Sequence, residues 1–357
     1  MFGAKQDRDG RTLMLTDALV FTVEGEPYRW RDVILSAVRW GAWHALETQV
    51  LEAAACVKHA EATGQPLPDG VLDAEGREFR YALDLVSAKS MEDWLSRWGL
   101  SVNDWMGYLR RKQMRARWPE LRRTLAEHHP LRDEDALRLT LVDAICSGEL
   151  DKWARTLARR AAIHANGSDP ASGAVTEPGS LDSWPFASTL FGADATTLHA
   201  AESRLRRMDD AFRQFRAAHV TARAVEAYVG LRHIDWVRVD CRVMAFPDEG
   251  MAAEAALLLR DDGEGFTSVY SAAHTLPRAD CFFLDQIDAG LRGAFLGART
   301  GDLIGPMRVD GEYVLYLIEE KTLPTPLDPA VMRRAEEGVL EQALERQTTG
   351  RVRWHSV

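Results

Sequence analysis

Apolar residues recur every three or four positions over most of this chain, which is the spacing of amphipathic helices. The clearest stretch runs from Leu35 through Leu46 and Val57 and ends at Gly64. Ser90 and Ser101 are each followed three residues later by an aspartate, and this spacing predicts two further helix starts. Together the periodic stretches predict helices over 35–64, 73–87, from 90, from 101, a helical pair over 132–165 with a break at Gly148, and helices over 194–228 and 328–347.

A second pattern, rich in β-branched and aromatic residues, predicts strands. It occupies 18–30, where Glu24 and Gly25 mark a turn between two short strands, and it recurs in the stretch from Ile234 to Pro324. That stretch predicts the order strand, helix, helix, strand, helix, strand, strand. The fold class we expect is therefore α+β, with a largely helical part and a small part built on a sheet.

Composition divides the chain into domains. Residues 166–193 are rich in Gly, Pro, Ser and Ala and lack periodicity, so we expect a connector there. It separates a helical domain over 1–165 from a connecting helix over 194–232 and a sheet domain over 233–323. A two-stranded hairpin is marginal alone. We therefore expect 324–357, which ends in the strand-like RVRWHSV, to return to the first domain.

Four segments of the sheet domain resemble parvulin-type peptidyl-prolyl isomerases. They are VRVDCRVMAF for the first strand, GEGF before the second helix, TGDLIGPM before the last hairpin and GEYVLYLIEEKTLP at the end of the sheet. The resemblance covers about a quarter of the chain. It implies a compact sheet domain with a pocket that grips proline and lowers the barrier to rotation of its amide, about 18–20 kcal/mol.

The first domain is similar in layout to the N-terminal domain of SurA-type chaperones. The resemblance rests on a strand pair that leads into a long helix and on the segment LSRWGLSVNDWMGYLRR. Those chaperones join a helical domain to parvulin units and bind unfolded polypeptide. The resemblance therefore implies a SurA-like domain, closed by the C-terminal helix and strand, beside a parvulin-like one.

The parvulin pattern departs from the family at its polar positions. The family's two histidines fall on Cys241 and Tyr313, and its serine falls on His274. Without both histidines the polar part of the pocket is missing, so we expect peptide binding rather than turnover and assign no catalytic residue. The resemblance then implies a peptide-binding set at Cys241, Val243, Phe266, His274, Phe282, Phe283, Tyr313 and Leu315.

Charge and cysteine spacing exclude several other functions. The net charge of −10 over 357 residues disfavours general nucleic-acid binding, which needs a basic surface over the phosphates. No apolar run has the length of a membrane span or the flanks of a signal peptide, so we expect a cytoplasmic protein. The four cysteines lack metal-ligand spacing, and we expect neither a metal nor a cofactor.

Two chemical alternatives stay open at this stage. Cys241 and His274 have the residue types of a thiolate–imidazolium pair, although a buried, inert cysteine is the commoner case. His233 and Asp235 have the spacing of two iron ligands, with His274 or His355 as a third, although such short pairs are frequent by chance.

These observations favour a peptide-binding, chaperone-like protein with a degenerate isomerase domain. An active but divergent prolyl isomerase and a metal-dependent peptide-modifying enzyme are the alternatives. The expected partner is a peptide or unfolded polypeptide. By analogy with ribosomal-peptide pathways of the crocagin type, it is a precursor peptide that is presented to a partner enzyme.

Overall fold

The computed structural model describes residues 16–167, 184–187, 195–260, 269 and 277–355, and its fold is mixed α+β. The chain forms two compact units. Unit 1 comprises Met1–Phe215 and Leu344–Val357, and unit 2 comprises Arg216–Ala343. By this division most of the connecting helix lies in unit 1, and 324–343 lies in unit 2.

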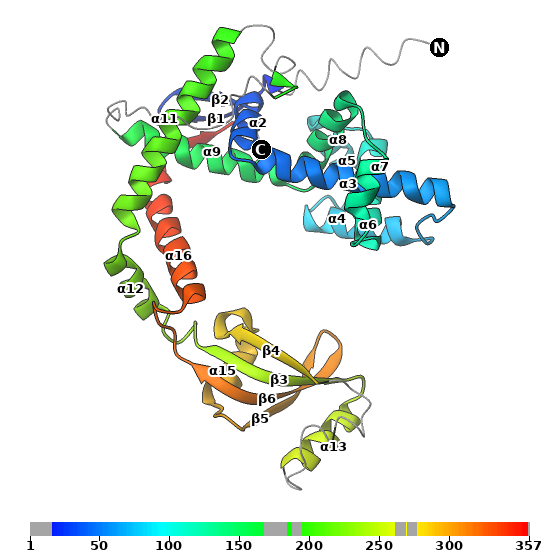
Figure 1. The fold of residues 1–357 in the computed structure, drawn as a ribbon, viewed down its shortest axis with the longest axis vertical. Coiled ribbons are helices and arrows are strands. Elements are labelled where there is room, and N and C mark those ends of the chain that lie inside the picture. The colour runs from blue at the N-terminus through cyan, green and yellow to red at the C-terminus, as the bar shows by residue number, and fades with distance from the viewer. Residues whose placement is uncertain (1–15, 168–183, 188–194, 261–268, 270–276, 356–357) are drawn as a thin grey trace. The chain divides into compact units, whose positions relative to one another are not determined.

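Unit 1 is largely helical and carries a three-stranded antiparallel sheet in the order β2-β1-β7 (Figure 1). Tyr28 of β2 stacks on Phe21 of β1 with ring centroids 4.7 Å apart, and Trp354 of β7 contacts the same Phe21 at 5.3 Å. The last strand therefore adds an aromatic residue to the hairpin. The elements are β1 (Leu19–Val23), β2 (Glu26–Arg29), α2 (Trp30–Arg39), α3 (Ala42–Thr63), α4 (Val71–Ala82), α5 (Ala88–Arg97), α6 (Val102–Arg117), α7 (Arg122–His128), α8 (Asp133–Cys146), α9 (Glu149–Asn166), most of α11 (Ala195–His219) and β7 (Val352–Trp354).

Unit 2 carries a four-stranded antiparallel sheet in the order β4-β3-β6-β5 (Figure 1). Strand β3 is the most buried of the four strands in this sheet. Its successive side chains alternate between the two faces of the sheet. Its elements are α12 (Ala222–Leu231), β3 (Arg238–Phe246), α13 (Glu249–Arg260), β4 (Arg278–Phe283), the 3₁₀ turn η2 (Leu284–Gln286), α15 (Ala289–Gly297), β5 (Leu303–Val309), β6 (Glu312–Thr322) and most of α16 (Pro329–Thr348).

Two helices that the periodicity predicted as continuous are broken. The first divides into α2 and α3 at Gly41, whose φ of 77° is the left-handed conformation that glycine adopts without strain. The second divides into α11 and α12, where the Thr221 side chain accepts a hydrogen bond from the Ala224 N–H and starts a new helix. The predicted start at Ser90 is also wrong, because Ser87 caps α5.

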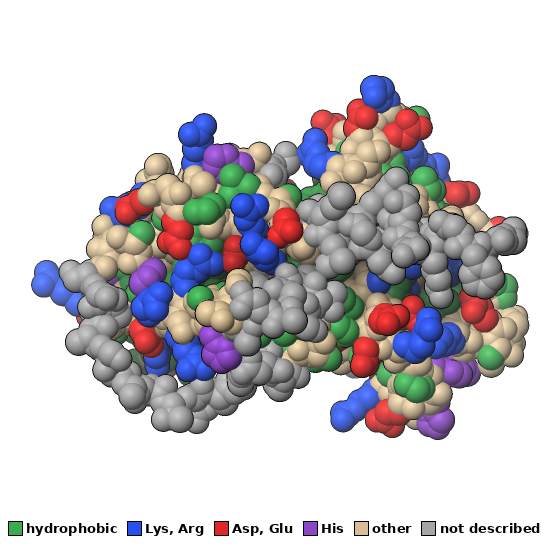
Figure 2. Space-filling view, turned by 90° about the horizontal axis from the view of Figure 1, so that it is seen from above, with side chains coloured by type: hydrophobic (Ala, Val, Ile, Leu, Met, Phe, Trp, Pro, Cys, Tyr) green, Lys and Arg blue, Asp and Glu red, His purple; other side chains and the backbone are tan. Residues whose placement is uncertain are grey.

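The described surface has mixed charge. Figure 2 shows Lys and Arg side chains interspersed with Asp and Glu side chains on one face, with small groups of hydrophobic side chains between them. In the parts of the chain that the structure describes, no helix combines the length and the apolarity needed to cross a bilayer.

Candidate functional site

Cys241 lies on β3 in the core of unit 2 and is only 1% exposed. Burial raises the pKa of its thiol to about 12, and the nearby Asp280 and Asp240 act in the same direction. At neutral pH the thiol is therefore protonated, which excludes a thiolate nucleophile in this state. The proposed imidazole partner, His274, lies outside the described residues, and so does Phe266.

Tyr313 and Leu315, from β6, lie on the opposite face of the sheet from Cys241 and Val243. Cys241 and Val243 pack with Phe295 of α15, whereas Tyr313 and Leu315 pack in a separate cluster with α13. The reason is the alternation of side chains along the strands, because Tyr313 pairs with Phe246 and Leu315 with Met244, in the same unbroken register that pairs Cys241 with Ile318. Phe246 is five residues from Cys241 along β3, and an odd separation puts two side chains of one strand on opposite faces.

The two phenylalanines of β4 are also separated. Phe282 joins the α15 side of the sheet, where its ring lies 5.4 Å from that of Phe295. Phe283 joins the cluster formed by α12 and α16, with the Arg334 guanidinium 4.4 Å from its ring centroid. The described members of the predicted peptide-binding set therefore occupy three different clusters, and the expected single apolar slot is not formed by them.

Polar residues around Trp236 in unit 2 are engaged in structural contacts. The Trp236 indole N–H donates to Asp285 at 3.0 Å, and Arg334 of α16 reaches the same carboxylate oxygen at 2.7 Å. The carboxylate thereby ties α16 to the end of the sheet.

The H-x-D pair does not gain a third ligand among the described residues. Asp235 pairs with Arg232 at 3.2 Å. His355 belongs to unit 1, where its ring lies 3.1 Å from the Thr22 hydroxyl. Over the described ranges, no group of three or more His, Cys, Asp or Glu side chains is placed to hold a metal ion.

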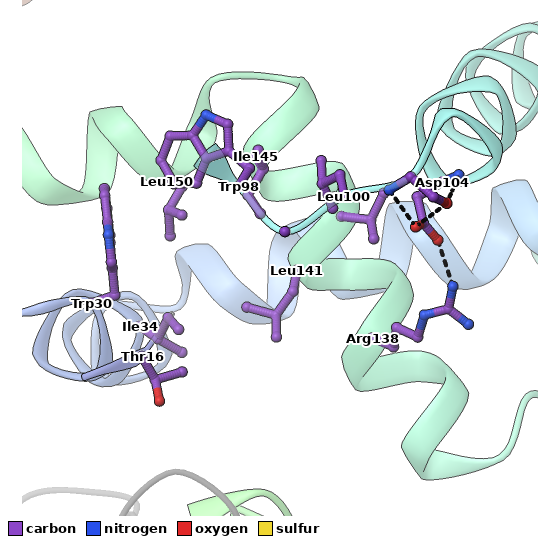
Figure 3. A pocket seen from close by; sticks show the side chains of 13 residues that line it. Thr16, Trp30, Ile34, Trp98, Leu100, Asp104, Arg138, Leu141, Ile145 and Leu150 are labelled. Carbon is purple, nitrogen blue, oxygen red and sulfur yellow. Dashed lines mark hydrogen bonds and ion pairs between the residues drawn. The ribbon is translucent and has the colours of Figure 1, made fainter. Parts of the chain in front are cut away.

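Unit 1 contains an apolar cavity of about 130 Å³ that the sequence did not predict. Figure 3 shows side chains from α2, the α5–α6 turn, α8 and α9 surrounding it. Trp30 and Trp98 stand at one side with ring centroids 5.3 Å apart. The remaining apolar lining is aliphatic and includes Ile34, Leu100, Leu141, Val142, Ile145 and Leu150. For comparison, a 150 Å³ apolar cavity accommodates benzene, so this one has about the size of one side chain.

One end of the cavity is polar. Arg138 of α8 forms an ion pair with Asp104 of α6, and the Ser101 hydroxyl donates to the same carboxyl group at 2.6 Å (Figure 3). Burial opposes ionisation of Asp104, but the hydrogen bonds from Ser101 and Arg138 outweigh it and lower the pKa of this carboxyl. A paired, ionised carboxylate therefore borders the apolar space at neutral pH.

The turn between α5 and α6 positions two side chains of the cavity lining, Trp98 and Leu100. Gly99 has a φ of 62°, which ends α5 in the left-handed conformation. Ser101 then caps α6 through the predicted capping box with Asp104. This sharp turn sets Trp98 and Leu100 against the cavity. The signal in the sequence was the segment WGLSVND, which predicted the turn but not its partners on α2, α8 and α9.

Comparisons with known proteins add no assignment. No protein-family model matches the chain, and no curated protein matches it.

Proposed function

We propose that this protein binds peptide segments and that the cavity of unit 1 receives one bulky apolar side chain of the bound peptide. The observation that carries the proposal is the cavity itself, which is lined by Trp and aliphatic side chains and closed at one end by an ion pair. Ligand sites in proteins commonly combine an apolar lining with a few placed polar groups. At about 130 Å³ the space fits a single side chain rather than a whole small-molecule cofactor, since typical ligand pockets enclose ~300–1,000 Å³.

In this proposal unit 2 is a parvulin-like domain that does not isomerise proline. The positions that match the family's histidines carry Cys241 and Tyr313, and these two side chains lie on opposite faces of the sheet. A pocket that stabilises a twisted amide needs its polar groups preorganised around one point. The placement of these two residues therefore supports binding without turnover.

The SurA-like arrangement belongs to the same proposal. Strand β7 pairs with β1, so the end of the chain completes the sheet of the helical unit. In a chaperone-like role the client is a peptide or an unfolded polypeptide, such as a ribosomal precursor peptide that is presented to a modifying enzyme.

The test is calorimetric titration of the full chain with two capped probes, acetyl-Ser-Gly-Leu-Gly-Ser-amide and its counterpart with Gly in place of Leu. Burial of one aliphatic side chain is worth ~1.5–3 kcal/mol, so the Leu probe should bind about 10- to 140-fold more tightly. Leu100→Phe should fill the cavity and remove this preference while preserving the melting temperature. Equal affinity for the two probes would refute the role of the cavity.

The matched control is Leu121→Phe. Leu121 is 50% exposed and does not line the cavity, so the same substitution there should leave the preference for the Leu probe unchanged. If both variants lose the preference equally, the effect does not come from filling the cavity.

A further inference from the structure

The ion pair at the polar end of the cavity is the part of the lining that solvent reaches. The Arg138 side chain is 47% exposed and that of Asp104 is 16% exposed. Trp30 and Ile34, which also line the cavity, are only 3% and 2% exposed. Figure 3 shows these two residues on the opposite side of the cavity from the ion pair. A side chain that enters from solvent therefore passes the ion pair, and its main chain stays beside that pair.

The carboxylate of Asp104 has room for one more donor. Its Oδ2 accepts from the Ser101 hydroxyl at 2.6 Å and from the Ser101 N–H at 3.0 Å, and its Oδ1 accepts from Arg138. A carboxylate offers about four lone-pair positions. Within the described ranges these three donors are the ones that reach it, so one position remains for a ligand.

The guanidinium of Arg138 has unused donors. An arginine carries five N–H donors in a planar fork. In the described part of the chain, the partner of this guanidinium is Oδ1 of Asp104, which it reaches through Nη2. The charges of the two groups cancel, so the pair selects neither an acidic nor a basic ligand. It presents an acceptor beside several donors, and this arrangement complements a neutral amide.

The main chain of a peptide residue supplies both groups. Every residue other than proline carries one N–H donor and one C=O acceptor. In an extended chain these two groups of one residue lie on the same edge, as they do when a residue exchanges two hydrogen bonds with a neighbouring strand. One residue can therefore reach a carboxylate and a guanidinium that lie next to each other.

We infer that Asp104 and Arg138 bind the main chain of the residue whose side chain fills the cavity. The Asp104 carboxylate accepts the N–H of that residue, and Arg138 donates to its C=O. The inference rests on the proposed function and specifies its ligand, because it requires a peptide residue with an N–H group. Proline and N-alkylated residues lack this donor, so the site excludes them at the position that fills the cavity.

The first test removes the donor from the ligand. In the Leu probe, the leucine is replaced by its α-hydroxy acid, so that an ester oxygen takes the place of the N–H. The net contribution of one hydrogen bond is a factor of ~2–13 in affinity, and we expect the ester probe to bind about fivefold more weakly. The control carries the same replacement at the first glycine of the probe and should bind like the parent. Equal affinity of the Leu probe and its leucine ester would overturn the role of Asp104.

The second test removes Arg138. Arg138→Met should weaken the Leu probe and its Gly counterpart by the same factor of about five, because both probes present the same main chain. The preference for Leu over Gly should persist, since the apolar lining is intact. Arg138→Lys keeps a charged donor and should recover most of the affinity. An Arg138→Met variant that binds both probes like the full chain would refute the role of this arginine.

The matched control is Arg132→Met. Arg132 forms an ion pair with Asp135 at 2.9 Å next to the start of the same helix, and it does not line the cavity. This substitution should leave both affinities unchanged. If Arg132→Met weakens the probes as much as Arg138→Met does, the effect comes from the loss of positive charge on α8 and not from a contact with the ligand.

The outcomes separate this inference from the proposed function. If the Leu probe binds and Leu100→Phe removes its preference, but neither the ester nor Arg138→Met weakens binding, only the main-chain assignment fails. If Arg138→Met removes the preference for Leu over Gly and leaves the affinity of the Gly probe unchanged, Arg138 is part of the apolar wall and the assignment is refuted. If no probe binds, the proposed peptide-binding function fails as well.

Discussion

Removal of residues 351–357 should destabilise unit 1, because β7 packs on the N-terminal hairpin. Strand β7 pairs with β1 over three positions, and Trp354 contacts Phe21. Somewhat more than half of the Trp354 surface is buried, which is worth ~2–3 kcal/mol at about 25 cal/mol per Å². The lost ladder bonds add ~1 kcal/mol each, and the freedom regained by the removed strand offsets much of this sum.

The net loss we expect is about 1–3 kcal/mol, which corresponds to a decrease in melting temperature of roughly 2–12 °C for a unit of this size. Tryptophan fluorescence measures it selectively, because every tryptophan except Trp236 belongs to unit 1. Trp354→Ala should give an intermediate decrease, since it removes the ring and keeps the strand. A truncated chain that melts at the temperature of the full chain would refute the stabilising role of β7.

Gly338→Ala should destabilise unit 2 by about 1–2 kcal/mol, because its new Cβ would lie 2.4 Å from the ring of Tyr228. Gly293→Ala should stabilise unit 2 by up to about 1 kcal/mol, because its new Cβ meets open space. Hydrogen exchange of the β3–β6 ladder measures both effects. Arg111→Met should lower the free energy of unfolding, measured with denaturant, by about 3–5 kcal/mol, because it leaves the buried Asp143 carboxylate without its ion-pair partner. The double variant Arg111→Met/Asp143→Leu should recover most of this free energy. Burial raises the pKa of the Asp143 carboxyl, so this group binds a proton more tightly in the folded state than in the unfolded chain. The Arg111→Met variant should therefore become more stable as pH falls through that raised pKa. A loss of stability that does not change with pH would contradict this reasoning. In a protease-coupled assay on a proline tetrapeptide, the full chain should leave the isomerisation rate at its uncatalysed value, and clear acceleration would contradict the proposed lack of turnover.

Much of the architecture follows from local patterns. Periodicity and capping residues predict most helices of unit 1, and the break at Gly148 between α8 and α9 is confirmed. The sequence pattern did not predict the break at Gly41, because apolar residues continue the three- and four-residue spacing across it. The mixed α+β class is confirmed, since it depends on composition and pattern rather than on long-range contacts.

The candidate sites depend on contacts that no local pattern contains. Cys241 and Tyr313 were grouped because each occupies a position where the family has a histidine, but Tyr313 pairs with Phe246, five residues from Cys241 on β3, so the two side chains lie on opposite faces. The pairing register of β3 with β6, which decides the faces, is specified by the packing of the sheet and not by a local pattern in either strand. The cavity likewise joins Trp30 to Leu150, residues 120 positions apart, and arises only when α2 and α9 pack together.

Photo-crosslinking can locate the bound Leu side chain on the protein. The Leu probe is prepared with a diazirine analogue at its central residue, irradiated with the full chain and mapped by mass spectrometry. If the cavity receives this side chain, attachment should occur at the cavity lining, around Trp98–Leu100 and Leu141–Leu150, and should be lost in Leu100→Phe. Attachment confined to the sheet of unit 2, between Arg238 and Thr322, would contradict it.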